Sequence, residues 1–359
     1  MSNASHNTTG RDRILTGDTP TGKLHLGHWV GSVRRRVELQ DSHECYFILA
    51  NMHAFTTRAD EPEAIRSDTL EIVRDLLCMG IEPERASIFL QSEVPAIAEL
   101  TFLFSMLLPF NRVMRNPTLK DEIKVKGLGE NYPFGFPLYA VGQTADILAF
   151  RPVAVPVGED QVPHLELTRE VARRFNQKYC NVGDKVEDED HVAEGGVFPV
   201  PVADVGKVGR LVGIDGDNKM SKSLNNAIYI SDTAKQVQKK VNKIYTGRQS
   251  PTEKGDPGNV LMQYCEIFIP DGDRVAELKR RYAEGDDIGD GHIKQELGAA
   301  INELLEPMRE RRLRFESDDD VIDVLKQGTV RANTVTEETL AMAKEAAGLG
   351  FFARDLSFR

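Results

Sequence analysis

Cysteine is scarce in this chain, and the few cysteines it has are isolated from one another. Cys45, Cys78, Cys180 and Cys265 lie far apart along the 359 residues, and none belongs to a CxxC pair. Zinc and redox sites use closely spaced pairs of that kind, and disulfide scaffolds need more cysteines in a shorter chain. We therefore expect reduced cysteines that serve mainly in packing, and no metal held by the protein itself.

Long hydrophobic runs are missing too. The longest, residues 100–110, is far too short to cross a bilayer, and the polar residues 1–12 contain no apolar segment of a secretion signal. The sequence predicts a cytoplasmic protein that makes no use of a membrane.

The chain also lacks an excess of positive charge. Its 45 lysines and arginines are outnumbered by 56 aspartates and glutamates, which gives a formal net charge of -11. A nucleic-acid partner would therefore have to meet a local basic patch on an acidic background.

Hydrophobic patterning in the first half alternates between short strands and amphipathic helices. Such alternation predicts an α/β fold, a Rossmann-like domain built on a parallel sheet. The expected strands are residues 14–16, 45–51, 87–91 and 153–157, and the expected helices are residues 26–37, 64–79, 96–107, 137–150 and 160–175. Residues 181–209 have loop composition, and a final strand is expected near residues 208–214.

Beyond residue 231 the strand signals stop and helical patterns take over. One apolar stripe contains Ile293, Leu297, Ile301 and Met308, and a further helix is expected to begin at Asp318 and end at Gly328. A capping-box pattern at residues 334–337 predicts that a last helix starts there. The expected organisation is a disordered segment 1–12, a Rossmann-like domain 13–226, an all-helical domain 227–330 and a C-terminal helix 331–359 that could pack back on the first domain.

Two histidines three residues apart, His25 and His28, open the first expected helix directly after the first expected strand. Free backbone N–H groups and the helix dipole attract phosphate at such a position. Gly27 lies between the histidines and lets a flat base or a backbone approach closely. Taken alone, HLGH could also be an ordinary first helical turn.

A second motif, Lys219-Met-Ser-Lys-Ser223, lies far downstream after Gly213, Gly216 and Asn218. This composition indicates a mobile loop that carries two ammonium groups. In this order, on a parallel α/β frame, HLGH and KMSKS resemble the HIGH and KMSKS signatures of class I aminoacyl-tRNA synthetases. The resemblance covers nearly the whole chain and implies a catalytic domain followed by a helical anticodon-binding domain.

Amino-acid activation places developing charge on phosphate oxygens, so it needs positioned cations and N–H donors rather than a nucleophilic side chain. The resemblance assigns the catalytic roles to His25, His28, Lys219 and Lys222. It also implies that ATP enters with Mg²⁺. The implied ATP contacts are Thr19, Thr21, Gly27, His28, Gly158, Glu159, Asp160, Leu211, Lys219, Met220, Ser221, Lys222 and Ser223.

Residues 158–161, Gly-Glu-Asp-Gln, follow an expected strand at the edge of the sheet where open α/β folds bind ligands. As a lone tetrapeptide they would more often be an acidic helix cap. The longer segment GEDQVPHLELTRE resembles the tryptophanyl-tRNA synthetases, which implies that Gly158, Glu159 and Asp160 contact the ATP ribose and that Gln161 approaches the substrate. His164 is interpreted as structural.

Tyr139, Gln143 and Asp146 are spaced to lie on one face of a helix. A carboxylate is a good partner for an indole N–H, and a buried partner discriminates against substrates that lack the group. Asp146 in isolation would more often be structural, but the run ADIL resembles the tryptophanyl family. We expect Asp146, Tyr139, Gln143 and Gln161 to bind tryptophan and, by the same resemblance, His53 to lie near it.

Three residues depart from the family pattern: Gln143 stands where methionine is usual, and Leu15 and Asp18 replace aromatic and apolar residues in the first loop. A tyrosyl enzyme of the same class remains an alternative, although it normally has a tyrosine near the first strand, where this chain has Leu15. A synthetase paralogue with a regulatory role and a small nucleotidyltransferase with HxGH chemistry are two further possibilities. The intact HLGH and KMSKS motifs argue against the regulatory paralogue, and the KMSKS loop and the helical second half argue against the nucleotidyltransferase.

The resemblance predicts a tryptophan–tRNA ligase that converts L-tryptophan and ATP to tryptophanyl-adenylate and pyrophosphate, then loads tRNA(Trp). Candidate tRNA contacts are Lys235, Lys239, Lys240, Lys243, Arg248 and residues 309–314. Members of the family are homodimers, so we expect the apolar helix 100–108, with Phe102, Phe104 and Met106, to pack against a second subunit.

Overall fold

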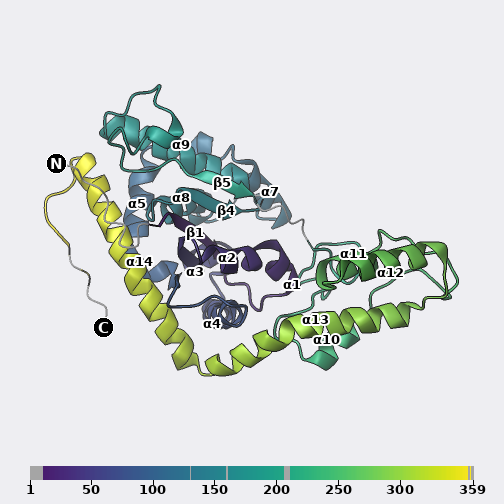
Figure 1. The fold of residues 1–359 in the computed structure, drawn as a ribbon. Coiled ribbons are helices and arrows are strands. Elements are labelled where there is room, and N and C mark those ends of the chain that lie inside the picture. The colour runs from purple at the N-terminus through teal and green to yellow at the C-terminus, as the bar shows by residue number, and fades with distance from the viewer. Residues whose placement is uncertain (1–10, 130, 159–160, 206–210, 355, 357–359) are drawn as a thin grey trace.

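The computed structural model describes residues 11–129, 131–158, 161–205, 211–354 and 356 (Figure 1). Its strands form one parallel sheet in the order β3-β2-β1-β4-β5. The strands are β1 (Arg13–Asp18), β2 (Glu44–Leu49), β3 (Ala86–Leu90), β4 (Ala154–Val157) and β5 (Val202–Val205). The order reverses between β1 and β4, as in doubly wound folds. The predicted Rossmann-like fold is therefore confirmed, while residues 1–10 of the expected disordered segment lie outside the described residues.

Side chains that alternate along the strands create two hydrophobic cores, one on each face of the sheet. Ile14 and Phe47 belong to the core that includes helix α4 (Pro62–Cys78) and continues into the helical half of the chain. Leu15 and Tyr46 belong to the core formed with α5 (Pro95–Ser105), α8 (Gly135–Leu148) and α9 (Val162–Tyr179). The sheet is thus covered on both faces, as a parallel sheet requires.

The remaining elements of the first half are short. The helix expected over residues 26–37 is divided into α1 (Leu26–His28), a π-helical segment η1 (Trp29–Val33) and α2 (Arg34–Leu39). π-helical segments of this kind occur often at functional sites. The others are α3 (Asn51–Arg58), a 3₁₀ turn η2 (Gln91–Glu93), α6 (Phe110–Val113), α7 (Pro117–Val125) and a 3₁₀ turn η4 (Asp188–Asp190).

Apart from isolated β-bridges, helices are the only regular elements within residues 211–354; the first begins at Ala234, after loops and turns, and no strand follows residue 231 in the described part of the chain, as predicted. Its helices are α10 (Ala234–Val241), α11 (Val260–Phe268), α12 (Gly272–Glu284), α13 (Asp290–Arg312), the 3₁₀ turn η5 (Leu313–Phe315) and α14 (Asp318–Ala346). Figure 1 shows α10 to α13 as an arm beside the sheet-containing body, with α13 leading back beneath α4 and α14 running along the body. The long helix α13 therefore connects the arm with the body, and α14 continues along the body.

Two expectations about elements are wrong. The last strand is β5 at Val202–Val205, in a segment assigned to loops; near residues 208–214 the described part holds only an isolated bridge between Val212 and Lys219. The helix break expected between Gly328 and Thr334 is absent, because α14 continues through both. A Cβ at Gly328 would lie 1.9 Å from the Ile88 carbonyl oxygen, so this glycine allows α14 to approach β3 and does not end the helix.

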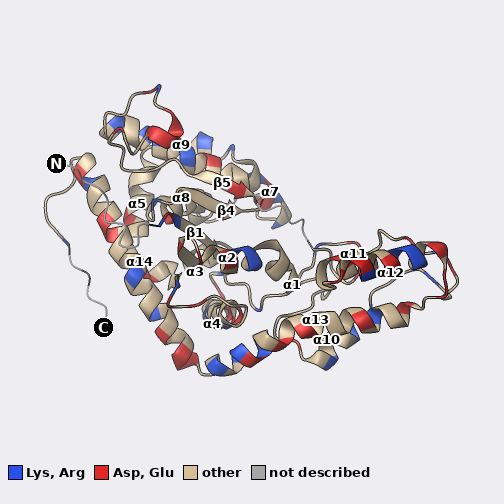
Figure 2. Cartoon of the chain, in the orientation of Figure 1, with Lys and Arg blue, Asp and Glu red and all other residues tan. Residues whose placement is uncertain are grey.

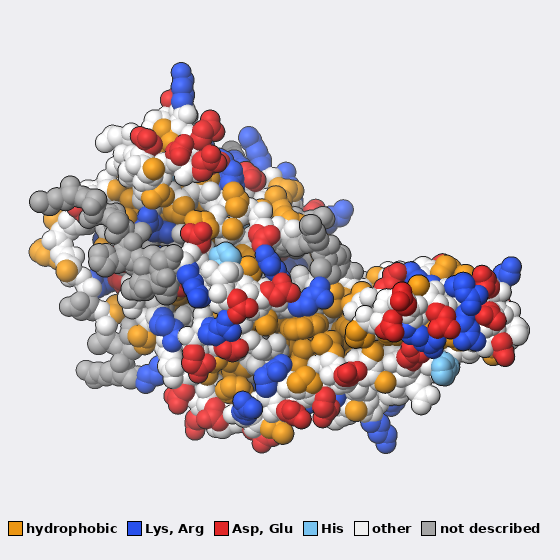
Figure 3. Space-filling view, in the orientation of Figure 1, with side chains coloured by type: hydrophobic (Ala, Val, Ile, Leu, Met, Phe, Trp, Pro, Cys, Tyr) orange, Lys and Arg blue, Asp and Glu red, His pale blue; other side chains and the backbone are white. Residues whose placement is uncertain are grey.

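Charges of both signs alternate over the body and the arm (Figures 2 and 3). Hydrophobic side chains gather on the visible surface where the arm meets the body (Figure 3). Within the described residues, no helix is both long enough and apolar enough to cross a membrane.

Candidate active site

A cavity of about 570 Å³ lies at the carboxyl ends of β1 and β4, where the strand order reverses. This is the position at which open α/β sheets bind ligands, and the volume is typical of small-molecule sites. Its lining brings together residues far apart in the sequence, from β1, β2, α3, α8, β4 and the hairpin around Lys219.

Tyr139, Gln143 and Asp146 all line this cavity from α8. Asp146 is 7% exposed, and the amide nitrogen of Gln91 donates to both of its carboxylate oxygens, at 2.9 and 3.0 Å. Burial raises the pKa of Asp146 to about 7, although the Gln91 hydrogen bonds work to lower it. Gln91 was not predicted from the sequence, where its only signal was its position directly after β3.

His53 and Gln161 complete this end of the cavity. The His53 ring packs edge-on against Tyr139, with ring centroids 4.5 Å apart, and burial lowers the pKa of His53 to about 4. Gln143 donates to the side-chain oxygen of Gln161 at 3.1 Å. His164 also lines the cavity and lies 3.3 Å from the Tyr139 hydroxyl, so the structural interpretation of His164 overlooked its contact with the site.

The departures at Leu15 and Asp18 occupy the floor of the same cavity. Leu15 is part of the core, while Asp18 forms an ion pair with the buried Arg36 at 2.5 Å. Burial alone would raise the pKa of Asp18, but the Arg36 guanidinium outweighs it and holds the pKa below its usual value. Arg35 and Arg36 line the cavity as well, although neither was predicted from the sequence.

The His28 ring of the HLGH segment has a defined tautomer. The His25 backbone N–H donates to Nδ1 of His28 at 3.1 Å, so a neutral His28 carries its proton on Nε2. Burial, reinforced by Lys222 and Lys219, lowers the pKa of His25 to about 3 and that of His28 to about 4. Both rings are therefore neutral near pH 7, and only His28 is part of the cavity lining.

Gly27 faces inward rather than into open space. A Cβ at this position would lie 2.9 Å from Nδ1 of His25 and 3.5 Å from Cβ of Met220. The KMSKS segment thus covers the glycine that was expected to lie against adenine.

The KMSKS segment follows a hairpin turn that Asn226 holds together. The Asn226 side chain accepts from the Ser221 N–H at 2.7 Å and donates to Asp215 at 2.9 Å, while Val212 pairs with Lys219 in an antiparallel bridge. A Cβ on Gly213 would lie 2.1 Å from the Asn226 amide, so glycine is required there. Asn226 therefore positions the motif without belonging to it.

The two lysines of the motif point to different places. Lys219 lines the cavity, whereas Lys222 donates to the Gly22 carbonyl oxygen at 2.7 Å and to the Thr21 hydroxyl at 3.3 Å. Burial lowers the pKa of Lys222. Lys222 thus lies beside the loop that leads into HLGH.

The other expected ATP contacts are only partly gathered at the cavity. Thr19, Thr21 and Gly158 line it, whereas Leu211 and Met220 are buried and hydrogen-bonded to each other through their backbones at 3.0 Å. Ser221 and Ser223 are 3.0 Å apart at their hydroxyls, outside the lining. Glu159 and Asp160 lie outside the described residues.

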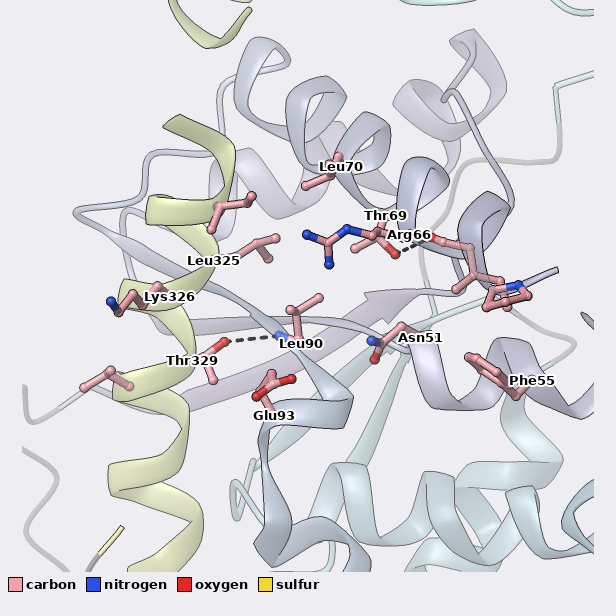
Figure 4. A pocket seen from close by; sticks show the side chains of 14 residues that line it. Asn51, Phe55, Arg66, Thr69, Leu70, Leu90, Glu93, Leu325, Lys326 and Thr329 are labelled. Carbon is pink, nitrogen blue, oxygen red and sulfur yellow. Dashed lines mark hydrogen bonds between the residues drawn. The ribbon is translucent and has the colours of Figure 1, made fainter. Parts of the chain in front are cut away.

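A second cavity, of about 530 Å³, lies between α3, α4, η2 and α14 (Figure 4). Leu70, Leu90 and Leu325 form part of its apolar lining, and Arg66 and Lys326 stand at its wall. None of the site residues expected from the sequence lines it, so the first cavity is the candidate active site. Within the described chain, no group of three or more His, Cys, Asp or Glu side chains is arranged to hold a metal ion.

Comparison with known proteins agrees with this geometry. The family model for class I tRNA synthetases (W and Y) matches residues 7–306. The tryptophan–tRNA ligase of Lactococcus lactis is 41% identical over 348 residues, covering 94% of this chain and 98% of the relative, and that of Treponema pallidum is 42% identical over 94% and 97%. The solved tryptophanyl-tRNA synthetase of Campylobacter jejuni complexed with ADP and tryptophan has a TM-score of 0.80 at 29% identity, covering 94% of this chain and all of that one.

The fold, the two signatures and the family match define the chain as a class I aminoacyl-tRNA synthetase. Within that class it belongs to the tryptophanyl-tRNA synthetase family, as the identity to the tryptophan–tRNA ligases over nearly its whole length shows. It is accordingly an ATP-dependent aminoacyl-tRNA ligase.

Proposed function

We propose that the chain activates L-tryptophan with ATP in the cavity between β1 and β4 and then transfers it to tRNA(Trp). The observation that carries this proposal is the Asp146 carboxylate, which lines the cavity and is held by Gln91. An indole N–H is a donor without acceptor capacity, so this carboxylate suits it. A substrate without that donor would bury the Asp146 carboxylate with no hydrogen bond from the ligand to add to those from Gln91.

The surroundings of Asp146 fit the rest of the amino acid. Tyr139 and His53 present ring surfaces against which an indole can pack. The Gln143 and Gln161 side chains, together with Glu122 on the same cavity wall, offer oxygen acceptors for the α-ammonium group. The α-carboxylate is then left to face the HLGH side of the cavity.

In the chemical step, a carboxylate oxygen of tryptophan attacks the α-phosphorus of ATP, and the bond to the bridging oxygen breaks as pyrophosphate leaves. Nε2–H of His28 donates a hydrogen bond to a phosphate oxygen, since Nδ1 is already an acceptor. Lys219 and Lys222 supply positive charge as the negative charge shifts onto pyrophosphate. Mg²⁺ arrives with ATP as part of the substrate.

The helical half offers a basic face for tRNA. Lys235 and Lys239 on α10, with Lys243 in the following turn, are exposed and have no ion-pair partner in the described part of the chain. Lys240, by contrast, pairs with Asp232, and Arg248 stacks on Tyr282. We assign tRNA backbone contacts to the first three lysines and place the reaction in the cytoplasm.

We also propose a homodimer through the end of α5 and the start of α6. Phe102, Met106 and Phe110 are 69%, 61% and 60% exposed there, whereas Phe104 of the same helix is buried. Of the residues expected at a subunit contact, Phe104 belongs instead to the core. Phe102, Met106 and Phe110 form an apolar surface of the kind that marks protein interfaces.

The deciding experiment is amino-acid-dependent ATP–pyrophosphate exchange by the purified chain with tryptophan, tyrosine or no amino acid. Exchange with tryptophan alone supports the proposal. Exchange with tyrosine would overturn the role of Asp146, and no exchange with either would favour a regulatory paralogue. Asp146→Ala is the matched variant, expected to abolish tryptophan-dependent exchange while ATP still binds.

A further inference from the structure

The peptide that leads into HLGH is held on both sides. The Leu24 N–H donates to Oδ2 of Asp75 at 2.7 Å, and the Leu24 carbonyl accepts from the Ile230 N–H at 3.1 Å. One residue later, His25 pairs with Tyr229 in an antiparallel bridge. The placement of HLGH therefore depends on Asp75 of α4 and on residues 228–230, which follow KMSKS.

Asp75 is fully buried, and its second oxygen is bound by the helical half of the chain. Nη1 of Arg312, at the end of α13, donates to Oδ1 of Asp75, while Nη2 of Arg312 donates to Glu71 at 2.8 Å. A carboxylate buried to this extent needs such donors to offset its lost hydration. Burial still raises the pKa of Asp75 to about 6, so its charge is maintained only with help from these contacts.

The last turn of α13 also contacts the segment that holds HLGH from the other side. Arg309 lies three residues before Arg312 and donates to the Asp232 carbonyl at 2.9 Å, and the Asp232 carboxylate in turn accepts from the Tyr229 N–H at 2.8 Å. A cavity of about 540 Å³ lies among these groups, lined by Arg74, Arg309 and Arg312. The last turn of α13 thus touches both supports of HLGH beside a space that is not densely packed.

These arginines were expected from the sequence to be candidate tRNA contacts. Arg309, Arg311 and Arg312 instead make hydrogen bonds within the chain, to Asp232, Cys78 and Asp75. Their side chains connect the helical arm to the catalytic body.

We infer that Asp75 is a positioning residue through which Arg312 of the helical domain sets the position of the Leu24 peptide, and with it His25 and His28. A shift of α13 that withdraws Arg312 leaves Asp75 as a buried carboxylate short of a donor, which weakens its hold on Leu24. The helical domain thereby controls how well the histidines are placed for adenylate formation. The inference rests on the proposed function for its kinetic test, because the rate to be measured is that of tryptophan-dependent pyrophosphate exchange.

Arg311 offers a matched control on the same helix. Its Nε donates to the Cys78 carbonyl of α4 at 2.7 Å, so it fastens the same two helices without touching Asp75 or Leu24. A merely structural role for Arg312 would make Arg311→Met and Arg312→Met equivalent. If Arg312 acts through Asp75, the two variants differ in kcat.

The test compares Asp75→Asn, Arg312→Met, the double variant, Arg312→Lys and Arg311→Met in the full-length chain. We expect each of the first two to lower kcat for tryptophan-dependent exchange by about tenfold. The double variant should be no slower than the slower single variant, because the two substitutions break the same connection from Arg312 through Asp75 to Leu24. Arg312→Lys should recover part of the rate, Arg311→Met should keep kcat, and the KM for tryptophan should stay within about twofold throughout.

Hydrogen exchange of the amides in residues 22–26 supplies a readout that needs no activity. Faster hydrogen exchange of the Leu24 amide in Arg312→Met, but not in Arg311→Met, supports the inference. This result would stand even if the wild-type chain showed no tryptophan-dependent pyrophosphate exchange, because that outcome refutes only the proposed function. Equal protection in both variants, or a double variant whose loss is the product of the single losses, would overturn the inference. Thermal unfolding identifies a variant that fails to fold, and Arg312→Lys then carries the comparison.

Discussion

Gln91 joins three elements at the candidate amino-acid site through one side chain. Its amide nitrogen donates to both carboxylate oxygens of Asp146, and its amide oxygen accepts from the backbone N–H of His53 at 3.0 Å. Both the nitrogen and the oxygen of the Gln91 amide are therefore engaged. A glutamine immediately after β3 thus fixes the carboxylate on α8 and the start of α3 in one arrangement.

Replacing Gln91 should weaken tryptophan binding without removing Asp146. In Gln91→Leu the buried carboxylate loses both hydrogen bonds from the Gln91 amide nitrogen, which costs about 1.5–3 kcal/mol and should raise the KM for tryptophan roughly ten- to hundredfold. Steady-state exchange kinetics measure this, with the KM for ATP expected to change little. Ser92→Ala is the control, because Ser92 is the exposed neighbour that bonds Asn51. A Gln91→Leu variant with an unchanged KM for tryptophan would contradict the role given to this pair.

Tryptophan affinity should depend on pH through Asp146. Its pKa is raised to about 7, and the indole N–H favours the ionised carboxylate, so binding lowers that pKa and releases a proton. Affinity should therefore increase by roughly tenfold between about pH 6 and pH 8 and level off above the pKa. His53 and His28, with pKa values lowered to about 4, do not change charge in that range. Calorimetry in two buffers checks this, and Asp146→Asn should remove the dependence.

The tautomer of His28 predicts unequal effects of two amide substitutions. His28→Gln places an amide donor near the position of Nε2, whereas His28→Asn places its amide near Nδ1 and leaves the phosphate without a donor. We expect His28→Asn to lower kcat by about 10²–10³-fold, the typical cost of one transition-state donor, and His28→Gln to lower it less. Single-turnover adenylate formation measures both. Equal losses, or the reverse order, would count against donation from Nε2.

The apolar surface on α5 and α6 predicts a subunit contact. Phe102→Glu should separate a dimer into monomers, because the exposed ring would become a charge within an apolar interface. Analytical ultracentrifugation of the wild-type chain and the variant measures this directly. Phe134→Glu, at another exposed phenylalanine, is the control and should leave the association state unchanged. A wild-type chain that sediments as a monomer at micromolar concentration would refute the contact.

The order of strands and helices followed from the sequence wherever periodicity was strong. β2 and α4 lie where the patterns indicated, because both are buried and regular. β5 was missed because Val202–Val205 is short, carries Asp204 and leaves Val202 and Val205 exposed rather than in the core, so it has no buried apolar run. Gly328 was interpreted as a helix end because local propensity cannot reveal that α14 crosses β3 closely enough to require a glycine.

At the site, the sequence indicated the residues that lie on one element or within one motif. Tyr139, Gln143 and Asp146 share a helix face, and that spacing alone was enough to bring them together at one cavity. Gln91, Asn226 and Asp75 act from other elements through hydrogen bonds that span 55, 5 and 51 residues. No periodicity or motif marks such partners, and only the tertiary arrangement reveals them.

The exposed lysines of α10 give a prediction for the second step of the reaction. Lys239→Glu should raise the KM for tRNA in aminoacylation while tryptophan-dependent pyrophosphate exchange, which needs no tRNA, stays unchanged. Removing one lysine–phosphate interaction should reduce the slope of log affinity against log salt by about one. Lys279→Glu makes the same change in net charge in the same half of the chain, but at an ammonium group already paired with Glu266, so it is the matched control. If the two variants weaken tRNA binding equally, overall charge rather than the α10 face attracts the tRNA; a loss confined to Lys239→Glu means that α10 contacts the RNA backbone.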